Sequence, residues 1–121
     1  MIQKFVIQEH TTPEGVHWDL MLEQDGVLAT FRLEREPAHC LTHEVRAERI
    51  FDHPLRFLTY EGPVQKETGR VRIADSGVYL RRDDRDDLLT LELNGAVLRG
   101  DFVLTRLKDA EWRFGPRHPP V

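Results

Sequence analysis

The sequence predicts a mostly β protein, folded as a small closed or nearly closed antiparallel β-barrel with at most short helical segments. Apolar and polar residues alternate with a period of two through much of the chain, which is the period of a half-buried strand. Turn residues interrupt this alternation at short intervals, and many short strands need a closed arrangement to hide their edges. No stretch has the pattern of a helix of normal length, although one short turn or helix is expected around residues 40–45.

The strands are expected where the alternation is clearest. Asp25-Gly26 predicts a hairpin turn between the second and third strands, and Asn94-Gly95 predicts another before the last long strand. The charged run from Arg81 to Asp87 is interpreted as a solvated hairpin loop rather than a phosphate-binding patch. The predicted strands are 4–8, 17–23, 27–33, 48–51, 70–74, 78–82, 88–93, 97–104 and 111–114.

Length and composition restrict the class of protein. The chain of 121 residues suits one domain, expected over residues 1–114, with a Pro-rich tail at 115–121. It carries 17 basic and 21 acidic side chains, which argues against coating nucleic acid by bulk electrostatics. Cys40 is the lone cysteine, so neither an internal disulfide nor a cysteine zinc site is expected. No membrane span or leader is recognised, and a cytoplasmic protein is expected.

The residues best suited to chemistry cluster near the N-terminus. His17 and Asp19 project from the same face of a predicted strand, and His10 lies just past the preceding strand, on a loop that can fold over that face. Two imidazoles and a carboxylate suit a divalent transition metal such as Mn²⁺, Zn²⁺ or iron. The alternative is a hydrogen-bonded surface pair. Glu23 shares this face and is interpreted as a supporting acceptor near the ligands or as a solvated carboxylate.

Other candidates are weaker when taken singly. His53 precedes Pro54 at a strand end, where functional residues commonly gather. Trp18 and Trp112 are of a type that stacks on bases, but tryptophan in a small β domain is more often part of the core.

Several segments together resemble a known family. In chain order they are FVIQEH, HWDLMLEQDGVL, DHPLRF, YEGPV, DSGVY and LNGAVLRGDFVLTRL, and they extend from Phe5 to Arg106. This series resembles the 3′-phosphoesterase domain of bacterial DNA ligase D, including its stand-alone versions. The resemblance implies a small β-barrel hydrolase of DNA repair, which removes a 3′-ribonucleoside and a 3′-phosphate from DNA ends with manganese during non-homologous end joining. It further implies His10, His17 and Asp19 as metal ligands and His53 as the phosphate contact or proton-transferring catalytic residue.

The chain also departs from the family pattern. Met21 stands where the family has an active-site arginine, and Phe57 stands where it has a tyrosine. Phosphate-binding substitutes are sought among nearby arginines, with Arg35 and Arg46 as the main candidates and Arg49 as a third. Losing a donor aimed at developing charge costs roughly 10²–10³ in rate in other enzymes.

Three functions therefore stay open. The first is a metal-dependent phosphoesterase acting on DNA 3′ ends, in partnership with a separate ligase or polymerase and away from any membrane. The second is a catalytically altered module that binds DNA ends or proteins. The third is a phosphoesterase for a small phosphorylated metabolite.

Overall fold

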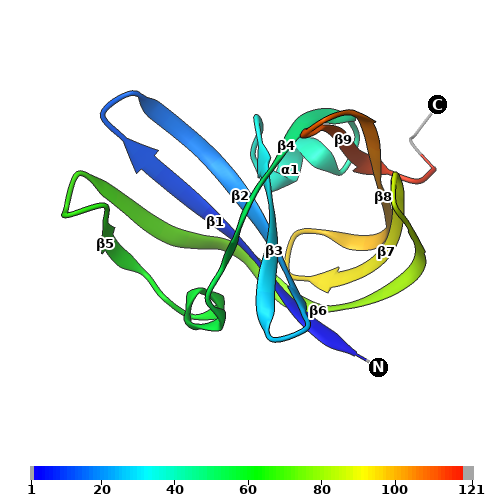
Figure 1. The fold of residues 1–121 in the computed structure, drawn as a ribbon, viewed down its shortest axis with the longest axis horizontal. Coiled ribbons are helices and arrows are strands. Elements are labelled where there is room, and N and C mark those ends of the chain that lie inside the picture. The colour runs from blue at the N-terminus through cyan, green and yellow to red at the C-terminus, as the bar shows by residue number, and fades with distance from the viewer. Residues whose placement is uncertain (1, 119–121) are drawn as a thin grey trace.

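The structure of this protein is a computed structural model that describes residues 2–118. Eight antiparallel strands close into a barrel, because β1 pairs with β2 on one side and with β6 on the other (Figure 1). The order around the barrel is β1–β2–β3–β4–β9–β8–β7–β6, and the short β5 pairs with the first part of β6. The expected closed antiparallel barrel is confirmed. Its strands are β1 Gln3–Thr12, β2 Gly15–Gln24, β3 Val27–Leu33, β4 Val45–His53, β5 Gly62–Val64, β6 Gly69–Arg85, β7 Leu88–Gly95, β8 Arg99–Lys108 and β9 Glu111–Pro116.

The first hairpin is longer than the sequence analysis predicted. β1 continues to Thr12 instead of ending at residue 8, and β2 begins at Gly15, so only Pro13 and Glu14 separate the two strands. His10 therefore lies within β1, directly opposite His17 in the antiparallel register, and not on a loop as expected. The ladder extends because residues on both sides of the turn keep exchanging backbone hydrogen bonds.

β6 joins two strands that were predicted separately. It runs without interruption through residues 69–85, with a register shift against β1 between Ile7 and Gln8. The charged run is consequently not a loop for most of its length: it forms the exposed end of β6, and the hairpin tip is Asp86–Asp87. Alternating charge is compatible with an exposed strand end, because neighbours such as Arg81 and Asp84 pair across the surface.

The Asn94-Gly95 prediction is corrected in the same region. Both residues lie in β7, and the chain reverses after them, where the Gly95 amide donates to the Leu98 carbonyl over 2.9 Å. Gly95 is paired with Gly77, and a Cβ on Gly95 would lie 2.7 Å from both the Asp75 carboxylate and the Phe5 ring. The glycine is therefore required for close packing rather than for a hairpin conformation.

Asp75 shapes the turn between β7 and β8. Its carboxylate is 3% exposed and accepts four backbone hydrogen bonds. The donors are the amides of Ser76, Ala96, Val97 and Leu98, at 2.8–3.1 Å. One buried side chain thus satisfies the polar backbone of the whole turn.

The short helix α1 spans Pro37–Cys40, just before the predicted position, and proline occupies its first turn. Burial raises the pKa of the Cys40 thiol to about 12, so this thiol is unreactive in the folded protein.

At the other end of the chain, β9 continues to Pro116, two residues past the predicted domain boundary at 114. Of the predicted tail, residues 119–121 lie outside the described residues. None of the helices within residues 2–118 combines the length and apolar composition needed to cross a membrane.

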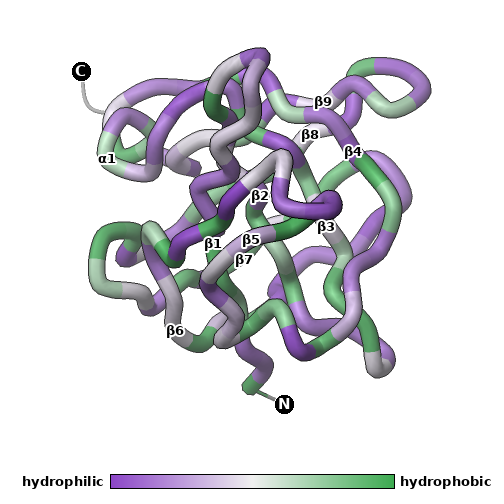
Figure 2. The backbone as a smooth tube through the Cα atoms, turned by 90° about the vertical axis from the view of Figure 1, so that its left-hand side faces the viewer, coloured by the Kyte–Doolittle hydropathy of each residue, from purple (hydrophilic) through white to green (hydrophobic). Residues whose placement is uncertain are grey.

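The barrel wall has two different faces at β1–β3. One face fills the main core with residues such as Ile7, Leu20 and Phe31, and Trp112 packs edge-on against Phe31. This assigns Trp112 to the core, and Trp18 is packed against the same core. Figure 2 shows the resulting alternation of hydrophobic and hydrophilic colour along the strands.

The opposite face of β1–β3 carries the polar candidates. It also carries a small apolar cluster of Val6, Met21 and Leu28, against which Phe57 and Leu58 pack. Phe57 and Leu58 belong to the 3-10 helix η1, Leu55–Leu58, so the segment between β4 and β6 covers this face. The candidate site lies between the barrel wall and that covering segment.

Candidate metal centre

Three predicted ligands meet on the outer face of β1 and β2. His10 Nδ1 lies 2.9 Å from His17 Nε2, and His17 Nε2 lies 3.6 Å from Asp19 Oδ2. One ligand atom from each residue falls within 4.8 Å of the others. The register explains this proximity: His10 is opposite His17, and Asp19 is two residues further along the same strand face.

The residues present fit a divalent ion. Ligand atoms bound at about 2.0–2.2 Å to a single ion lie roughly 3–3.5 Å apart, which is close to the separations found here. Within residues 2–118, His10 Nε2 is the only buried side-chain nitrogen or oxygen without a hydrogen-bond partner. This nitrogen lies against Gly69, where a Cβ would be 2.8 Å from it, and the His10 atom that faces His17 is Nδ1. Nitrogen and carboxylate donors of this kind suit Mn²⁺, Zn²⁺ or Fe²⁺.

Arg32 is the basic residue of the site that the sequence analysis missed. Its Nε donates to Asp19 Oδ1 over 3.2 Å, and this is the only hydrogen bond of the Arg32 side chain within the described part of the chain. The sequence could have predicted this pairing from the second hairpin. The two-residue Asp25-Gly26 turn places Gln24 opposite Val27, and counting back along both strands places Asp19 opposite Arg32.

His53 is the last residue of β4 and lies beside the three candidate ligands, here called the triad. Its Nδ1 is 2.9 Å from Thr30 Oγ1, and the Thr30 hydroxyl donates to the Leu28 carbonyl. Because the hydroxyl proton is already used, Thr30 accepts from His53, which assigns the ring proton to Nδ1. In the neutral ring, Nε2 therefore carries the free lone pair.

A cavity of about 360 Å³, here called the triad cavity, joins these groups. His10, Asp19, Arg32 and His53 line it together with residues of the covering segment. Gln8 holds that segment against the barrel wall, because its side-chain amide donates to the Phe57 and Tyr60 carbonyls at 3.0 Å each.

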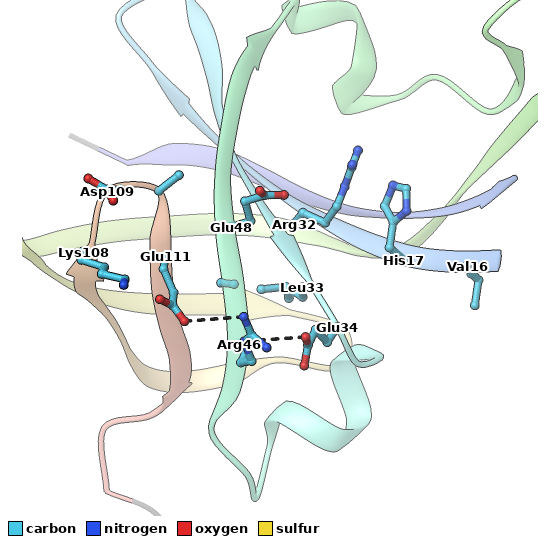
Figure 3. Close-up of a pocket in the computed structure, with 12 residues that line it drawn as sticks. Val16, His17, Arg32, Leu33, Glu34, Arg46, Glu48, Lys108, Asp109 and Glu111 are labelled. Atoms are coloured by element: carbon cyan, nitrogen blue, oxygen red, sulfur yellow. Dashed lines mark ion pairs between the residues drawn. The ribbon is translucent and has the colours of Figure 1, made fainter. Parts of the chain in front are cut away.

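A second cavity of about 610 Å³, here called the lateral cavity, lies on the other side of Arg32. Figure 3 shows Arg32 and His17 at one end of it, while Arg46 is bound between Glu34 and Glu111. The metal ligands are thus reached from both sides, with His17 facing the lateral cavity and His10 and Asp19 facing the triad cavity. Four carboxylates and three arginine or lysine side chains line the lateral cavity, so it has no surplus of positive charge for a nucleic-acid backbone.

The remaining predicted residues lie away from the triad. Arg35 follows the end of β3 and pairs with Glu36, so it lines neither the triad cavity nor the lateral cavity. Arg46 lines the lateral cavity, but its guanidinium is already occupied by ion pairs with Glu34 and Glu111.

Glu23 accepts a hydrogen bond from the Lys4 amide over 2.9 Å and does not support the candidate metal ligands. Arg49 is held by Asp52 and by the Thr30 carbonyl. The guanidinium beside the triad therefore comes from Arg32.

The pKa shifts of the site residues favour the protonation states that bind a cation. Burial lowers the pKa of His10, and the neighbouring His17 lowers it further. Burial also lowers the pKa of His53, against the opposing effect of Asp19. For Asp19, burial acts to raise the pKa, but the hydrogen bond from His17 and the charge of Arg32 outweigh it and leave the pKa below its usual range. Near pH 7 the site therefore presents neutral His10 and His53 rings and an ionised Asp19.

These shifts predict how the stability of the metal-free protein depends on pH. Folded His10 and His53 have pKa values below the unfolded value of about 6.5, so the unfolded chain binds more protons as pH falls through that value. The free energy of unfolding should drop between pH 7.5 and 5.5, by at most about 1.4 kcal/mol per pH unit for each histidine. Asp19 contributes only at lower pH, where its carboxyl takes up a proton.

Urea unfolding in the presence of a chelator measures this dependence. Replacing His53 with glutamine should flatten the pH profile, whereas replacing the exposed His43 should leave it unchanged. An equal slope in the native protein and the His53→Gln variant would contradict the assignment.

Comparisons with known proteins match most of the chain to one family. Residues 8–106 match the family described as the DNA Ligase D 3′-phosphoesterase domain. The chain is 31% identical over 123 residues to the multifunctional non-homologous end joining protein LigD of Mycolicibacterium smegmatis, covering 90% of the chain and 16% of that protein. It is 34% identical over 115 residues to LigD of Mycobacterium bovis, covering 89% of the chain and 15% of that protein.

A similar protein also occurs outside the mycobacterial group. LigD of Pseudomonas aeruginosa is 30% identical over an alignment of 123 positions, and the match covers 90% of this chain and 14% of that protein. The chain thus spans about one-sixth of the length of these relatives, and the residues matched to the family include His10, His17 and Asp19.

Proposed function

Because this chain belongs to the DNA ligase D 3′-phosphoesterase domain family, we propose that it is a divalent-metal-dependent phosphoesterase that trims 3′ ends at DNA breaks. The substrates proposed are a 3′-phosphate and a 3′-terminal ribonucleoside, and the setting is non-homologous end joining, which is named in the relatives. The observation that carries the proposal is the His10–His17–Asp19 cluster beside a cavity that also holds Arg32 and His53. Mn²⁺ is the proposed ion, with Zn²⁺ as the alternative.

The residues of the chain divide the work of phosphate-ester hydrolysis. When bound by His10, His17 and Asp19, the ion supplies Lewis-acid polarisation of a phosphate oxygen. Arg32 keeps its terminal nitrogens for the phosphate, since only Nε is bonded to Asp19. His53 Nε2 takes a proton from the attacking water, because Thr30 holds the other ring nitrogen. For a 3′-phosphate, the water oxygen then bonds to phosphorus as the bond to the 3′ oxygen breaks, and the leaving 3′ oxygen takes up a proton to become the 3′ hydroxyl.

Two departures from the family pattern bear on a second candidate, a module that binds DNA ends without hydrolysing them. Met21 is 1% exposed within an apolar cluster, and Phe57 meets the His53 ring edge-on with centroids 5.6 Å apart. Neither side chain can donate a hydrogen bond to phosphate. Arg32 supplies a guanidinium beside the same ligands, and this favours hydrolysis over binding alone.

The test is an assay of the purified chain on a 5′-labelled primer–template whose primer ends in a 3′-phosphate. Mn²⁺ is expected to yield a 3′-hydroxyl primer, and a chelator to stop the reaction. The same primer with a 5′-phosphate serves as the control and should remain intact. Binding of the 3′-phosphate end without release would favour the binding module. Faster hydrolysis of glycerol phosphate or sugar phosphates would favour a metabolite phosphatase, and no metal-dependent binding or turnover would contradict the proposal.

Contact with DNA should be limited to the end. The chain has a net charge of −4, and four carboxylates face three cationic side chains along the lateral cavity. We therefore propose that the DNA end is presented by a separate ligase or polymerase rather than held by a long basic surface. Such limited phosphate contact corresponds to a shallow dependence of binding on salt concentration.

A further inference from the structure

An exposed aromatic ring stands at the rim of the triad cavity. Phe51 lies near the end of β4 and is 73% exposed, more than any other large hydrophobic side chain within residues 2–118. It lines the same cavity as His10, Asp19 and His53. The fold does not need this ring for its core, because Phe51 belongs to neither buried cluster.

The ring is held in a defined orientation. Phe51 stacks on His53 with centroids 4.7 Å apart and ring planes 22° from parallel. His53 in turn meets Phe57 edge-on. Thr30 fixes the His53 ring, and that ring supports one side of Phe51. Because the Phe51 side chain is exposed, part of its surface is free to contact another flat group.

The surroundings select the kind of group that can cover this ring. Arg56 lies at the same rim, its guanidinium carbon 4.5 Å from the Phe57 ring centroid. Asp52, beside Phe51, is exposed and paired with Arg49, so the apolar surface at this point does not extend into a broad patch. These features match a nucleotide, which combines a flat base with a phosphate. The supported Phe51 ring suits the base, and the guanidinium and the lining of the triad cavity suit the phosphate.

We propose that Phe51 is a stacking platform for the terminal nucleobase of the strand whose 3′ end enters the triad cavity. The inference rests on the proposed function and deepens it, because it makes a nucleotide rather than a simple phosphate ester the substrate class. Stacking uses the face that every base has, so the platform accepts all four bases. A small phosphorylated metabolite without a base would gain nothing from Phe51.

The experiment compares two labelled primers that end in a 3′-phosphate, one with a normal terminal nucleotide and one with an abasic terminal residue. Fluorescence anisotropy measures their affinities for the native protein and for the Phe51→Ala and Phe51→Trp variants. Phe51→Ala should weaken binding of the normal end by about 5- to 100-fold and leave the abasic end unchanged. Phe51→Trp should preserve the preference for the normal end.

Leu107 offers a matched control, because it is 50% exposed on β8 and lines neither the triad cavity nor the lateral cavity. Leu107→Ala should bind both primers as the native protein does. Equal affinity of the native protein for the two primers, or equal weakening of both by Phe51→Ala, would overturn the inference.

The binding measurement needs no turnover, so the two proposals can fail separately. Hydrolysis with no base preference would reject the platform and leave the phosphoesterase. A base preference without hydrolysis would reject catalysis and leave the platform, and failure of the native protein to bind either primer would reject the platform together with the DNA end as substrate.

Discussion

Replacing His17 with alanine is expected to weaken Mn²⁺ binding by more than about 100-fold and to abolish metal-dependent phosphate release. Changes to residues that only support metal ligands cost about 10- to 100-fold in affinity, so losing a ligand should cost more. His17 is the ligand whose removal disturbs the fold least, since its side chain is 21% exposed whereas that of Asp19 is 4% exposed. Asp19 also holds Arg32, so its removal would leave a guanidinium without a partner.

Calorimetric titration with Mn²⁺ measures the affinity, and the primer assay measures turnover. His43→Ala is the matched control, because His43 is exposed and stacks only on His39 in the helical region. It should bind Mn²⁺ and release phosphate at native levels. Native Mn²⁺ affinity in the His17→Ala variant would remove this residue from the metal centre.

Replacing Asp75 with alanine should destabilise the barrel by about 3 kcal/mol, because buried amides left without an acceptor cost about 1–3 kcal/mol each and water can reach some of them. The carboxylate accepts from four amides, three of them in the turn between β7 and β8. For a domain of this size the loss corresponds to a fall in Tm of about 10 °C.

The Asp75→Asn variant distinguishes the contribution of the acceptor oxygens from that of the negative charge. The asparagine oxygen can replace Oδ1, which accepts from Ser76, Ala96 and Val97, but its amide group would oppose the Leu98 amide. An intermediate loss is therefore expected. Asp101→Ala, at an exposed position on β8, serves as the control and should change stability by less than about 0.5 kcal/mol. A loss below about 1 kcal/mol in Asp75→Ala would contradict the structural role given to this carboxylate.

Local patterns predicted the clustering of the candidate metal ligands. His17 and Asp19 share a strand face because side chains alternate, and the structure brings them together with His10 as expected. The sequence did not reveal that His10 lies inside β1. Only two residues, Pro13 and Glu14, form the turn, and they do not show how far the pairing of β1 with β2 extends. The clustering of the three candidate ligands was predicted, whereas the position of His10 within a strand was not.

The missed residue and the wrong turn have a common cause. Arg32 lies 13 residues after Asp19 and reaches it only through strand pairing. The Asn94-Gly95 pair suggested a hairpin, but contacts with Gly77, Asp75 and Phe5 place it inside a strand. In both cases a residue distant in sequence decides the local structure, and short-range turn preferences carry no information about such contacts.

The sequence by itself determined the barrel class, the two-residue turn at Asp25-Gly26 and the clustering of His10, His17 and Asp19. These depend on side-chain alternation, turn chemistry and an ordered series of motifs. Only the tertiary structure decided that Arg32 rather than Arg35 stands beside the ligands, that Thr30 fixes the His53 ring, and that Phe51 is exposed at the cavity rim. The physical reason is that charge pairing, ring orientation and exposure depend on neighbours brought together by closure of the barrel and by the segment that covers one of its faces.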